Sequence, residues 1–313
     1  MPSTICHLIE VKASKGLACN HGAVLVRGTM TMAQNSSREF GGSHQPTGDL
    51  PSGAILMFVI LTFAITWGIG GAYIYFPDWM EPRFGELTGL HPLFVIGTWG
   101  PAIAGVILVL AFTGLKGLRA FLSRLLLWRT ALHWWLLILF GLPLLFVIGS
   151  LIKGGGILAE LPEEGLAVAF LITAVMLFLG PMEELGWRGV AQPLLQRFIA
   201  PFWVGILIGL VWGVWHLPAF FLAGVVHSSW DFATFLVGCM AAAVLVTPIF
   251  NRSKGSLLLP VLLHWQLNIP FWPDGQPWDT YILVGIAALV TWFYRGEMFS
   301  RSNAVVRVIP ETT

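Results

Sequence analysis

From Pro51 onward, long apolar runs alternate with short polar connections along the chain. Each run has roughly 17–25 residues, which is the length that a helix needs to cross a bilayer. We predict eight membrane helices at about 52–76, 91–113, 132–152, 165–185, 202–223, 232–250, 256–273 and 279–294. Proline and glycine recur inside the runs, and membrane helices tolerate them better than soluble helices do. The pattern predicts an all-α fold, a polytopic membrane helix bundle of about eight transmembrane helices.

Three segments fall outside this pattern. Residues 114–129 alternate leucines with basic residues, which is typical of one amphipathic helix lying in the membrane interface. Residues 1–50 are polar, and we interpret them as a disordered N-terminal tail, with Met30 or Met32 as an alternative start. The transmembrane domain is then 51–294, followed by a C-terminal tail over 295–313.

Composition supports a membrane protein. Hydrophobic residues make up 56% of the chain and charged residues 11%, whereas soluble domains carry about 25% charged residues. The mean hydropathy is +0.79. The net charge of +1, without a basic stripe, excludes nucleic acid as a partner, and three cysteines exclude a disulfide framework. The expected surroundings of the chain are therefore a lipid bilayer.

Basic residues predict the orientation, because they accumulate in cytoplasmic loops. With a cytoplasmic N-terminus, the outside loops carry only Arg83 and Lys153. The inside loops and the C-terminal tail carry Lys116, Arg119, Arg124, Arg129, Arg188, Arg197, Arg252, Lys254, Arg295, Arg301 and Arg307. We predict a multi-pass protein of the cell membrane with both termini in the cytoplasm.

A few polar residues lie inside the apolar runs, where a charge costs at least about 2.5–3.5 kcal/mol at the helix centre. They are Glu183 and Glu184, followed by Arg188, then His216, and finally His264 with Asn268. On a helix, Arg188 follows Glu184 at the spacing of a same-face ion pair. Around the helix axis, Glu183 points about 100° away from Glu184, and it is left free to face the interior of the bundle.

Each of these residues has a purely structural interpretation. The acids and Arg188 form a charge cluster at a helix end in that case, and the histidines make interhelical hydrogen bonds. Their joint occurrence in one chain favours a functional site. The site requires Glu183 and His216 to lie at one depth. We therefore predict that the fourth helix extends to about 190–192 and that residues 186–192 face protein or water.

The residues match three motifs in order. Glu183 to Arg188 reads as EExxxR, Trp212 to His216 as a variant of FxxxH, and His264 to Asn268 as HxxxN. Together they resemble the CPBP family (CAAX-protease and bacteriocin-processing, or Abi, proteins), whose members are Rce1-like intramembrane endopeptidases. The resemblance is close over about 165–270 and extends to the helix architecture over 51–294. Trp212 stands where the family usually has phenylalanine.

The resemblance implies that a peptide bond is hydrolysed in or near the membrane. Its substrate is then a peptide or protein, either a prenylated CAAX C-terminus or another membrane-associated peptide. Glu183 would act as the general base and His216 would position the water, while His264 and Asn268 would hold the oxyanion. Glu184, Arg188 and Trp212 would support these catalytic residues.

Two questions stay open in the sequence. No cofactor is firmly implied, but Glu183, His216 and His264 form a ligand set that suits zinc. The absence of an HExxH motif favours chemistry without a metal. The alternative functions are a proton-coupled transporter, in which the same acids and histidines relay protons, and a non-catalytic bacteriocin-immunity or maturation protein.

Overall fold

The computed structural model describes residues 48–157, 163 and 165–311, and within them the secondary structure is helical, without strands. Residues 1–47 of the predicted tail lie outside the described residues. The first half contains α1 (Ala54–Tyr75), α2 (Pro77–Phe84), α3 (Pro92–Thr98), α4 (Gly100–Leu122), α5 (Leu132–Leu136) and α6 (Leu142–Lys153). The second half contains α7 (Leu166–Met176), α8 (Glu184–Gly186), α9 (Gln192–Gln196), α10 (Pro201–Trp215), α11 (Phe232–Arg252), α12 (Leu258–Leu267), α13 (Trp278–Phe293) and α14 (Arg295–Met298).

Within the described residues, six helical segments are long and apolar enough to cross a membrane. They are Ala54–Tyr75, Gly100–Leu126, Leu132–Lys153, Leu166–Gln196, Pro201–Phe221 and Phe232–Arg252. The remaining two predicted helices are shorter apolar helices, Leu258–Leu267 and Trp278–Phe293. The predicted run over 91–113 is divided at Trp99 into α3 and α4. The predicted membrane helix bundle is confirmed, with these differences in helix length.

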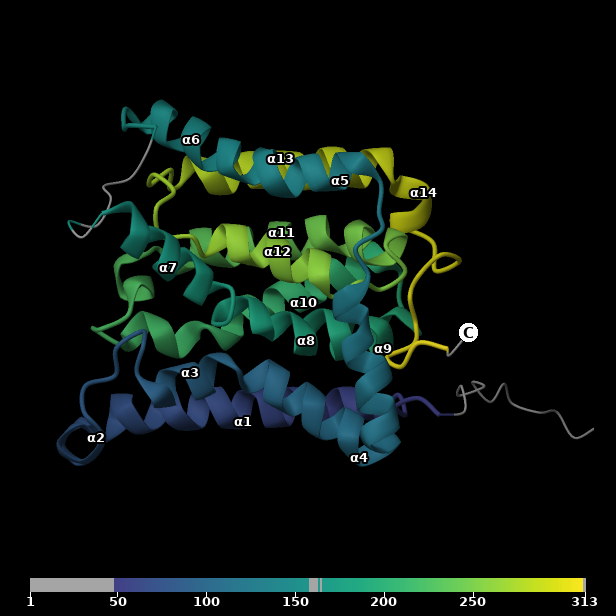
Figure 1. Ribbon diagram of the computed structural model, residues 1–313, viewed down its shortest axis with the longest axis horizontal. Coiled ribbons are helices and arrows are strands. Elements are labelled where there is room, and N and C mark those ends of the chain that lie inside the picture. The colour runs from purple at the N-terminus through teal and green to yellow at the C-terminus, as the bar shows by residue number, and fades with distance from the viewer. Residues whose placement is uncertain (1–47, 158–162, 164, 312–313) are drawn as a thin grey trace, which may run out of the picture. The chain divides into compact units, whose positions relative to one another are not determined.

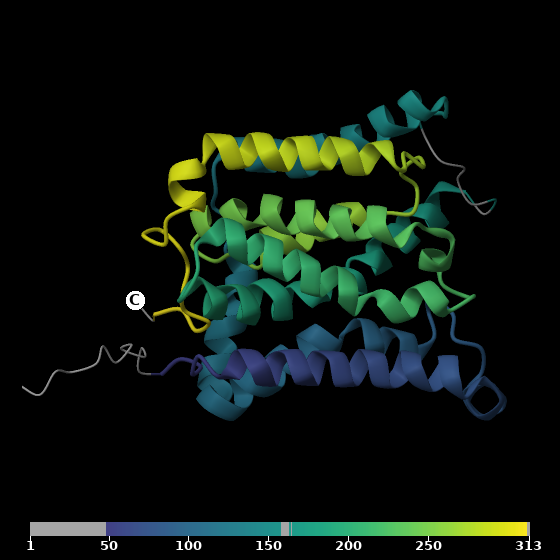
Figure 2. The same ribbon diagram turned by 180° about the vertical axis from the view of Figure 1, so that it is seen from behind.

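The helices form three layers (Figures 1 and 2). One outer layer contains α13 beside α5 and α6, and the other contains α1, α3 and α4. Between them lie α8, α10, α11 and α12, and the central part of α11 from Ala241 to Phe250 is buried throughout. Outer helices present large exposed apolar side chains such as Leu56, Phe140 and Trp292. Lipid tails solvate such apolar side chains without the free-energy cost of exposing them to water. Their position on the outer layers is therefore typical of a membrane protein.

Close contact between α10 and α11 depends on small residues. A Cβ atom at Gly209 would meet the backbone of Met240, and one at Gly205 would lie 3.0 Å from the Cα atom of Val244. Both glycines lie on one face of α10, four residues apart. Glycine at these positions lets the two helix backbones approach closely, which is a common way to hold helices together in membranes.

The fourth predicted helix is broken and then continues. It ends at Met176, turns over 177–179, and resumes at Gly180 with a short 3-10 turn (η3, Gly180–Glu183). It then runs through α8 and a π-helical turn (η4, Trp187–Ala191) to Gln196 in α9. Residues 186–192 are all buried in protein. The predicted extension to about 190–192 is therefore confirmed, and the helix continues to Gln196; residues 186–192 face protein, one of the two predicted surroundings.

The predicted amphipathic segment is helical from the end of α4 through a 3-10 turn at Ser123–Leu126. A bend at Gly114, which has a φ of 65°, separates it from the rest of α4. One expectation is wrong: Arg124 does not face the membrane surface but is 2% exposed. Its guanidinium donates to the carbonyl oxygens of Gly255 at 2.7 Å and Val308 at 2.9 Å. Arg124 thus ties the amphipathic segment to two distant parts of the chain.

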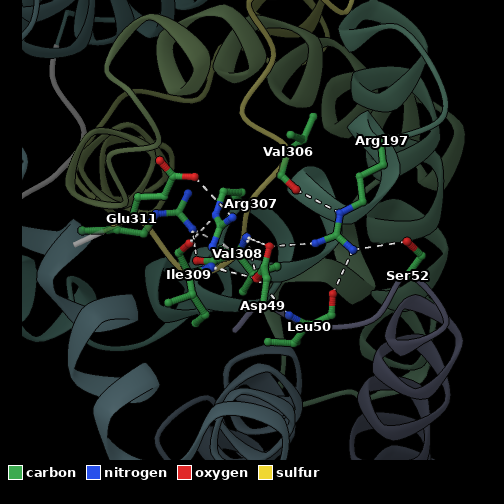
Figure 3. Close-up of polar contacts among 11 residues, drawn as sticks. Asp49, Leu50, Ser52, Arg197, Val306, Arg307, Val308, Ile309 and Glu311 are labelled. Atoms are coloured by element: carbon green, nitrogen blue, oxygen red, sulfur yellow. Dashed lines mark hydrogen bonds and ion pairs between the residues drawn. The ribbon is translucent and has the colours of Figure 1, made fainter. Parts of the chain in front are cut away.

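The two ends of the described chain meet around Asp49 (Figure 3). The buried Asp49 carboxylate accepts a hydrogen bond from Arg197 Nη2 at 2.8 Å and others from the backbone N–H groups of Val308 and Ile309. Arg197 also donates to the Leu50 carbonyl oxygen at 2.8 Å. The predicted C-terminal tail therefore packs onto the bundle as far as Ile309, which is 7% exposed.

We expect Asp49→Asn to lower the free energy of unfolding by about 2–4 kcal/mol, because it leaves a largely buried guanidinium without its carboxylate. Chemical unfolding of the purified protein in detergent measures this change. Glu311→Gln is the matched control. Glu311 pairs with Arg307 but its side chain is 77% exposed, so its loss should cost no more than about 1 kcal/mol. Equal losses for the two variants would contradict the anchoring role of Asp49.

Candidate active site

Glu183 lies at the end of η3, buried in the middle of the bundle with 2% exposure. Its Oε2 atom accepts a hydrogen bond from Trp212 Nε1 at 2.7 Å and a longer one from Trp187 Nε1 at 3.4 Å. Among the described residues, Oε1 has no hydrogen-bond partner and is left for a ligand in the adjoining cavity. The two indoles therefore fix one oxygen and leave the other available.

Glu184 is the centre of a second buried group. Its Oε1 atom accepts from Arg188 Nη1 at 3.2 Å, so the predicted ion pair is present. The same oxygen lies 2.9 Å from His264 Nδ1, a contact that the sequence did not predict. All three side chains are nearly inaccessible to solvent. Because the carboxylate accepts, Nδ1 of His264 is the donor, and the ring is held with its Nε2 atom free.

His216 caps the C-terminal end of α10 and is half-buried. Its Nδ1 atom lies 2.8 Å from the carbonyl oxygen of Trp212. A carbonyl oxygen only accepts, so Nδ1 carries the proton and, in the neutral ring, Nε2 is an acceptor. The Trp212 indole contacts both histidine rings, with centroid distances of 5.6 Å to His216 and 5.2 Å to His264. Trp212 thus links Glu183 to both imidazoles.

Asn268 ends α12, one helical turn after His264. Both side chains approach Gly180 at the start of η3, since an added Cβ there would clash with Asn268 Nδ2 and lie 3.3 Å from His264 Nε2. Glycine at 180 therefore leaves a space that the amide and the imidazole face.

A cavity of about 870 Å³ adjoins all four predicted catalytic residues, Glu183, His216, His264 and Asn268. It also adjoins His227. His227 lies in the connection between α10 and α11, and its ring stacks on His216 with centroids 5.5 Å apart. Burial lowers the pKa of the His227 imidazole to about 4, so this ring is neutral at pH 7.

The sequence missed three residues of the site. Trp187 follows Glu183 at the i, i+4 spacing, and that spacing was a sufficient signal for a contact. Gly180 precedes the acids directly, in a Gly-Pro pair that often marks a break. His227 offered no local signal, because its position against His216 arises from the folding of an aromatic-rich connection.

The residues do not fit the zinc site considered above. In the part of the chain that the structure describes, no group of three or more His, Cys, Asp or Glu side chains is arranged to hold a metal ion. The atoms left for a ligand are Glu183 Oε1 and Nε2 of each histidine, because Oε2 and both Nδ1 atoms are engaged within the protein. A zinc ligand set would need the remaining atoms of all three residues to converge.

We expect Gly180→Ala to lower kcat by about 10–100-fold, because the added methyl group displaces Asn268 from the space beside the site. Gly285→Ala is the control, since a Cβ atom at Gly285 in α13 meets open space. That variant should keep full activity. Peptide-cleavage rates of both purified variants in detergent measure the difference, and an unchanged rate for Gly180→Ala would contradict the placement of Asn268.

Fold and site together define a polytopic membrane protein that holds a carboxylate, two imidazoles and an amide around one internal cavity. Residues 165–270 match the family described as Rce1-like, type II CAAX prenyl endopeptidase Rce1-like. The chain is also similar to "CAAX prenyl protease 2" from Methanococcus maripaludis, with 23% identity over 270 residues. That alignment covers 78% of this chain and 94% of the relative.

The matched region contains all three motifs, from Glu183 to Asn268. In this region the chain is similar to the Rce1-like membrane proteases of the CPBP group. The resemblance inferred from the motifs is thereby confirmed. Both comparisons point to proteases, so the transporter and the non-catalytic protein are not favoured.

Proposed function

We propose that this protein is an intramembrane endopeptidase in which Glu183 activates the water that attacks the peptide bond. The observation that carries the proposal is the position of Glu183, buried, oriented by two indoles, and facing a cavity shared with His216, His264 and Asn268. A carboxylate buried inside a membrane protein costs free energy, so its presence at this position favours a functional role. A protease family and a relative named as a protease support the same reaction class.

In the proposed reaction, a water molecule lies between Glu183 Oε1 and His216 Nε2. Glu183 accepts a proton as the water oxygen bonds to the carbonyl carbon. Asn268 Nδ2 donates to the developing oxyanion. The His264 ring, which the Glu184 carboxylate holds through Nδ1, borders the same space with its Nε2 atom. Glu183 then passes the proton to the leaving nitrogen as the C–N bond breaks, so the protons balance.

The proposed location is the cell membrane, with both termini in the cytoplasm. The support is the distribution of Lys and Arg between the two ends of the bundle. The proposed substrate is a membrane-associated peptide. A prenylated C-terminal CAAX peptide is the substrate class suggested by the family description and by the name of the archaeal relative.

A cleavage assay with the purified full-length protein tests the proposal. The substrates are a panel of prenylated and unprenylated peptides in detergent, each with and without a chelator. We expect turnover that resists the chelator. Turnover that is lost on chelation and restored by zinc would overturn the metal-free reaction. No turnover on any peptide would overturn the peptidase function and return the transporter to consideration.

A further inference from the structure

His227 lines the cavity around Glu183 but has no part in the reaction proposed above. It lies in a 3-10 turn (η6, Val226–Ser229) within the connection between α10 and α11. Its carbonyl oxygen accepts from the N–H of Trp230 at 3.1 Å. Asp231 follows as the N-cap of α11. The backbone that carries the ring is therefore fixed by hydrogen bonds up to the start of the next helix.

The His227 imidazole packs against four other aromatic rings. It stacks on His216 with the centroids 5.5 Å apart and an angle of 29° between the planes. The rings of Phe220, Trp230 and Phe235 lie at centroid distances of 5.7, 4.7 and 5.3 Å. Such packing holds the ring in one orientation, so the fold sets the direction in which its two nitrogens point.

The two nitrogens differ in their surroundings. Among the described residues, Nδ1 is buried without a hydrogen-bond partner, whereas Nε2 is not closed off in this way and is left for the cavity. The ring is neutral at pH 7, as described above, so one nitrogen carries the proton and the other a lone pair. Buried donors without an acceptor are rarer in proteins than buried acceptors without a donor. The proton therefore belongs on Nε2, which makes this atom a donor at the cavity.

A peptide supplies the acceptor that suits such a donor. Each of its carbonyl oxygens loses water on entering a cavity, and leaving one unpaired there costs free energy. The stacking distance of 5.5 Å separates His227 from His216, which contacts the water in the proposed reaction. An extended peptide rises about 3.3 Å per residue, so this distance corresponds to about one or two residues. His227 is thus placed to meet a neighbouring peptide group and not the reacting carbonyl.

We infer that His227 is a substrate-binding residue, whose Nε2–H group donates to a main-chain carbonyl oxygen about one or two residues from the scissile bond. The inference rests on the proposed peptidase function and adds a contact with the substrate in the same cavity. A contact with the main chain is independent of the side chains of the peptide. It holds the peptide backbone in register with Glu183, and its loss should weaken binding more than the chemical step.

Two substitutions in the full-length protein separate this hydrogen bond from the packing of the ring. His227→Phe keeps an aromatic ring against His216 but has no donor. His227→Gln has no ring, but its amide N–H group can take the place of Nε2–H. With a peptide that wild type cleaves in detergent, we expect KM to rise about tenfold in His227→Phe while kcat stays within about threefold. In His227→Gln, KM should return to within about threefold of the wild-type value.

His133→Phe is the matched control, because the cavity lining in the described part of the chain does not include His133 of α5. Its KM should equal that of wild type. A wild-type KM in His227→Phe would overturn the inference. A KM raised equally in His227→Phe and His227→Gln would also overturn it, because the missing donor would not then be the cause. A wild-type protein that cleaves no peptide would instead overturn the peptidase function.

Peptide isosteres locate the contact on the substrate. In each probe, one peptide bond other than the scissile bond is replaced by an E-alkene, which removes one carbonyl oxygen. If His227 binds that oxygen, the isostere and His227→Phe remove the same hydrogen bond, and their effects do not multiply. We expect one position at which the isostere raises KM about tenfold for wild type but less than about twofold for His227→Phe. Equal factors for the two proteins at every position would contradict the inference.

Discussion

We expect Glu183→Gln to lower kcat by about 10²–10⁴-fold, the usual contribution of a general base. Glutamine keeps the size of the side chain, and its carbonyl oxygen accepts from Trp212 as Oε2 does. It has no basic oxygen to take a proton from water. Binding of the peptide should therefore be nearly unchanged and KM should stay within about threefold, since the loss falls on the chemical step.

The matched control for this change is Glu297→Gln. Glu297 lies in α14 at the other end of the bundle, where it pairs with Arg252. Initial rates over a range of peptide concentrations, measured for both variants in one detergent, should show full activity for Glu297→Gln. If Glu183→Gln keeps more than a tenth of the wild-type kcat while both variants unfold at the wild-type temperature, Glu183 is not the base.

The largest expected effect on stability belongs to Arg188→Ala. The change leaves the Glu184 carboxylate buried without its guanidinium, and Glu184 Oε2 already has no partner among the described residues. Breaking a buried pair in this way costs about 3–5 kcal/mol. The orientation of His264 depends on the same carboxylate, so activity should also fall. Chemical unfolding in detergent, followed by tryptophan fluorescence, measures the stability change.

Arg252→Ala is the comparison for this prediction. Arg252 also forms an ion pair with a glutamate, but its side chain is 40% exposed. Pairs of this kind contribute about 0–1 kcal/mol. A double variant, Glu184→Gln with Arg188→Met, should recover part of the stability because it removes both buried charges together. An equal loss in the free energy of unfolding for Arg188→Ala and Arg252→Ala would show that the buried ion pair stabilises the fold no more than the exposed one.

Local spacing predicted part of this site. The i, i+4 relation between Glu184 and Arg188 predicted their ion pair and left Glu183 free, as the structure shows. The same rule applied to Trp187 would have predicted its contact with Glu183. The pairing of Glu184 with His264 joins residues 80 positions apart, and no pattern within one helix can predict such a contact.

The positions of the helices could be predicted where the length of an apolar run alone decides whether it spans the bilayer. In the part of the chain that the structure describes, eight apolar helical segments occur near the predicted runs, because the bilayer sets the length of a spanning helix. The break over 177–179 was not predicted, although Gly180 and Pro181 follow it, because membrane helices often continue through such pairs. Arg124 was placed at the surface because hydropathy treats every arginine alike, whereas three backbone carbonyl oxygens accept from this one.

The central claim is that water activated at Glu183 hydrolyses a peptide bond, and mass spectrometry of products formed in ¹⁸O-labelled water tests it most directly. Wild type and Glu183→Gln are incubated side by side with one peptide that wild type cleaves. The account predicts two fragments from wild type, with one ¹⁸O atom in the newly formed carboxylate, and intact peptide from Glu183→Gln. Labelled fragments from both proteins at equal rates would contradict it.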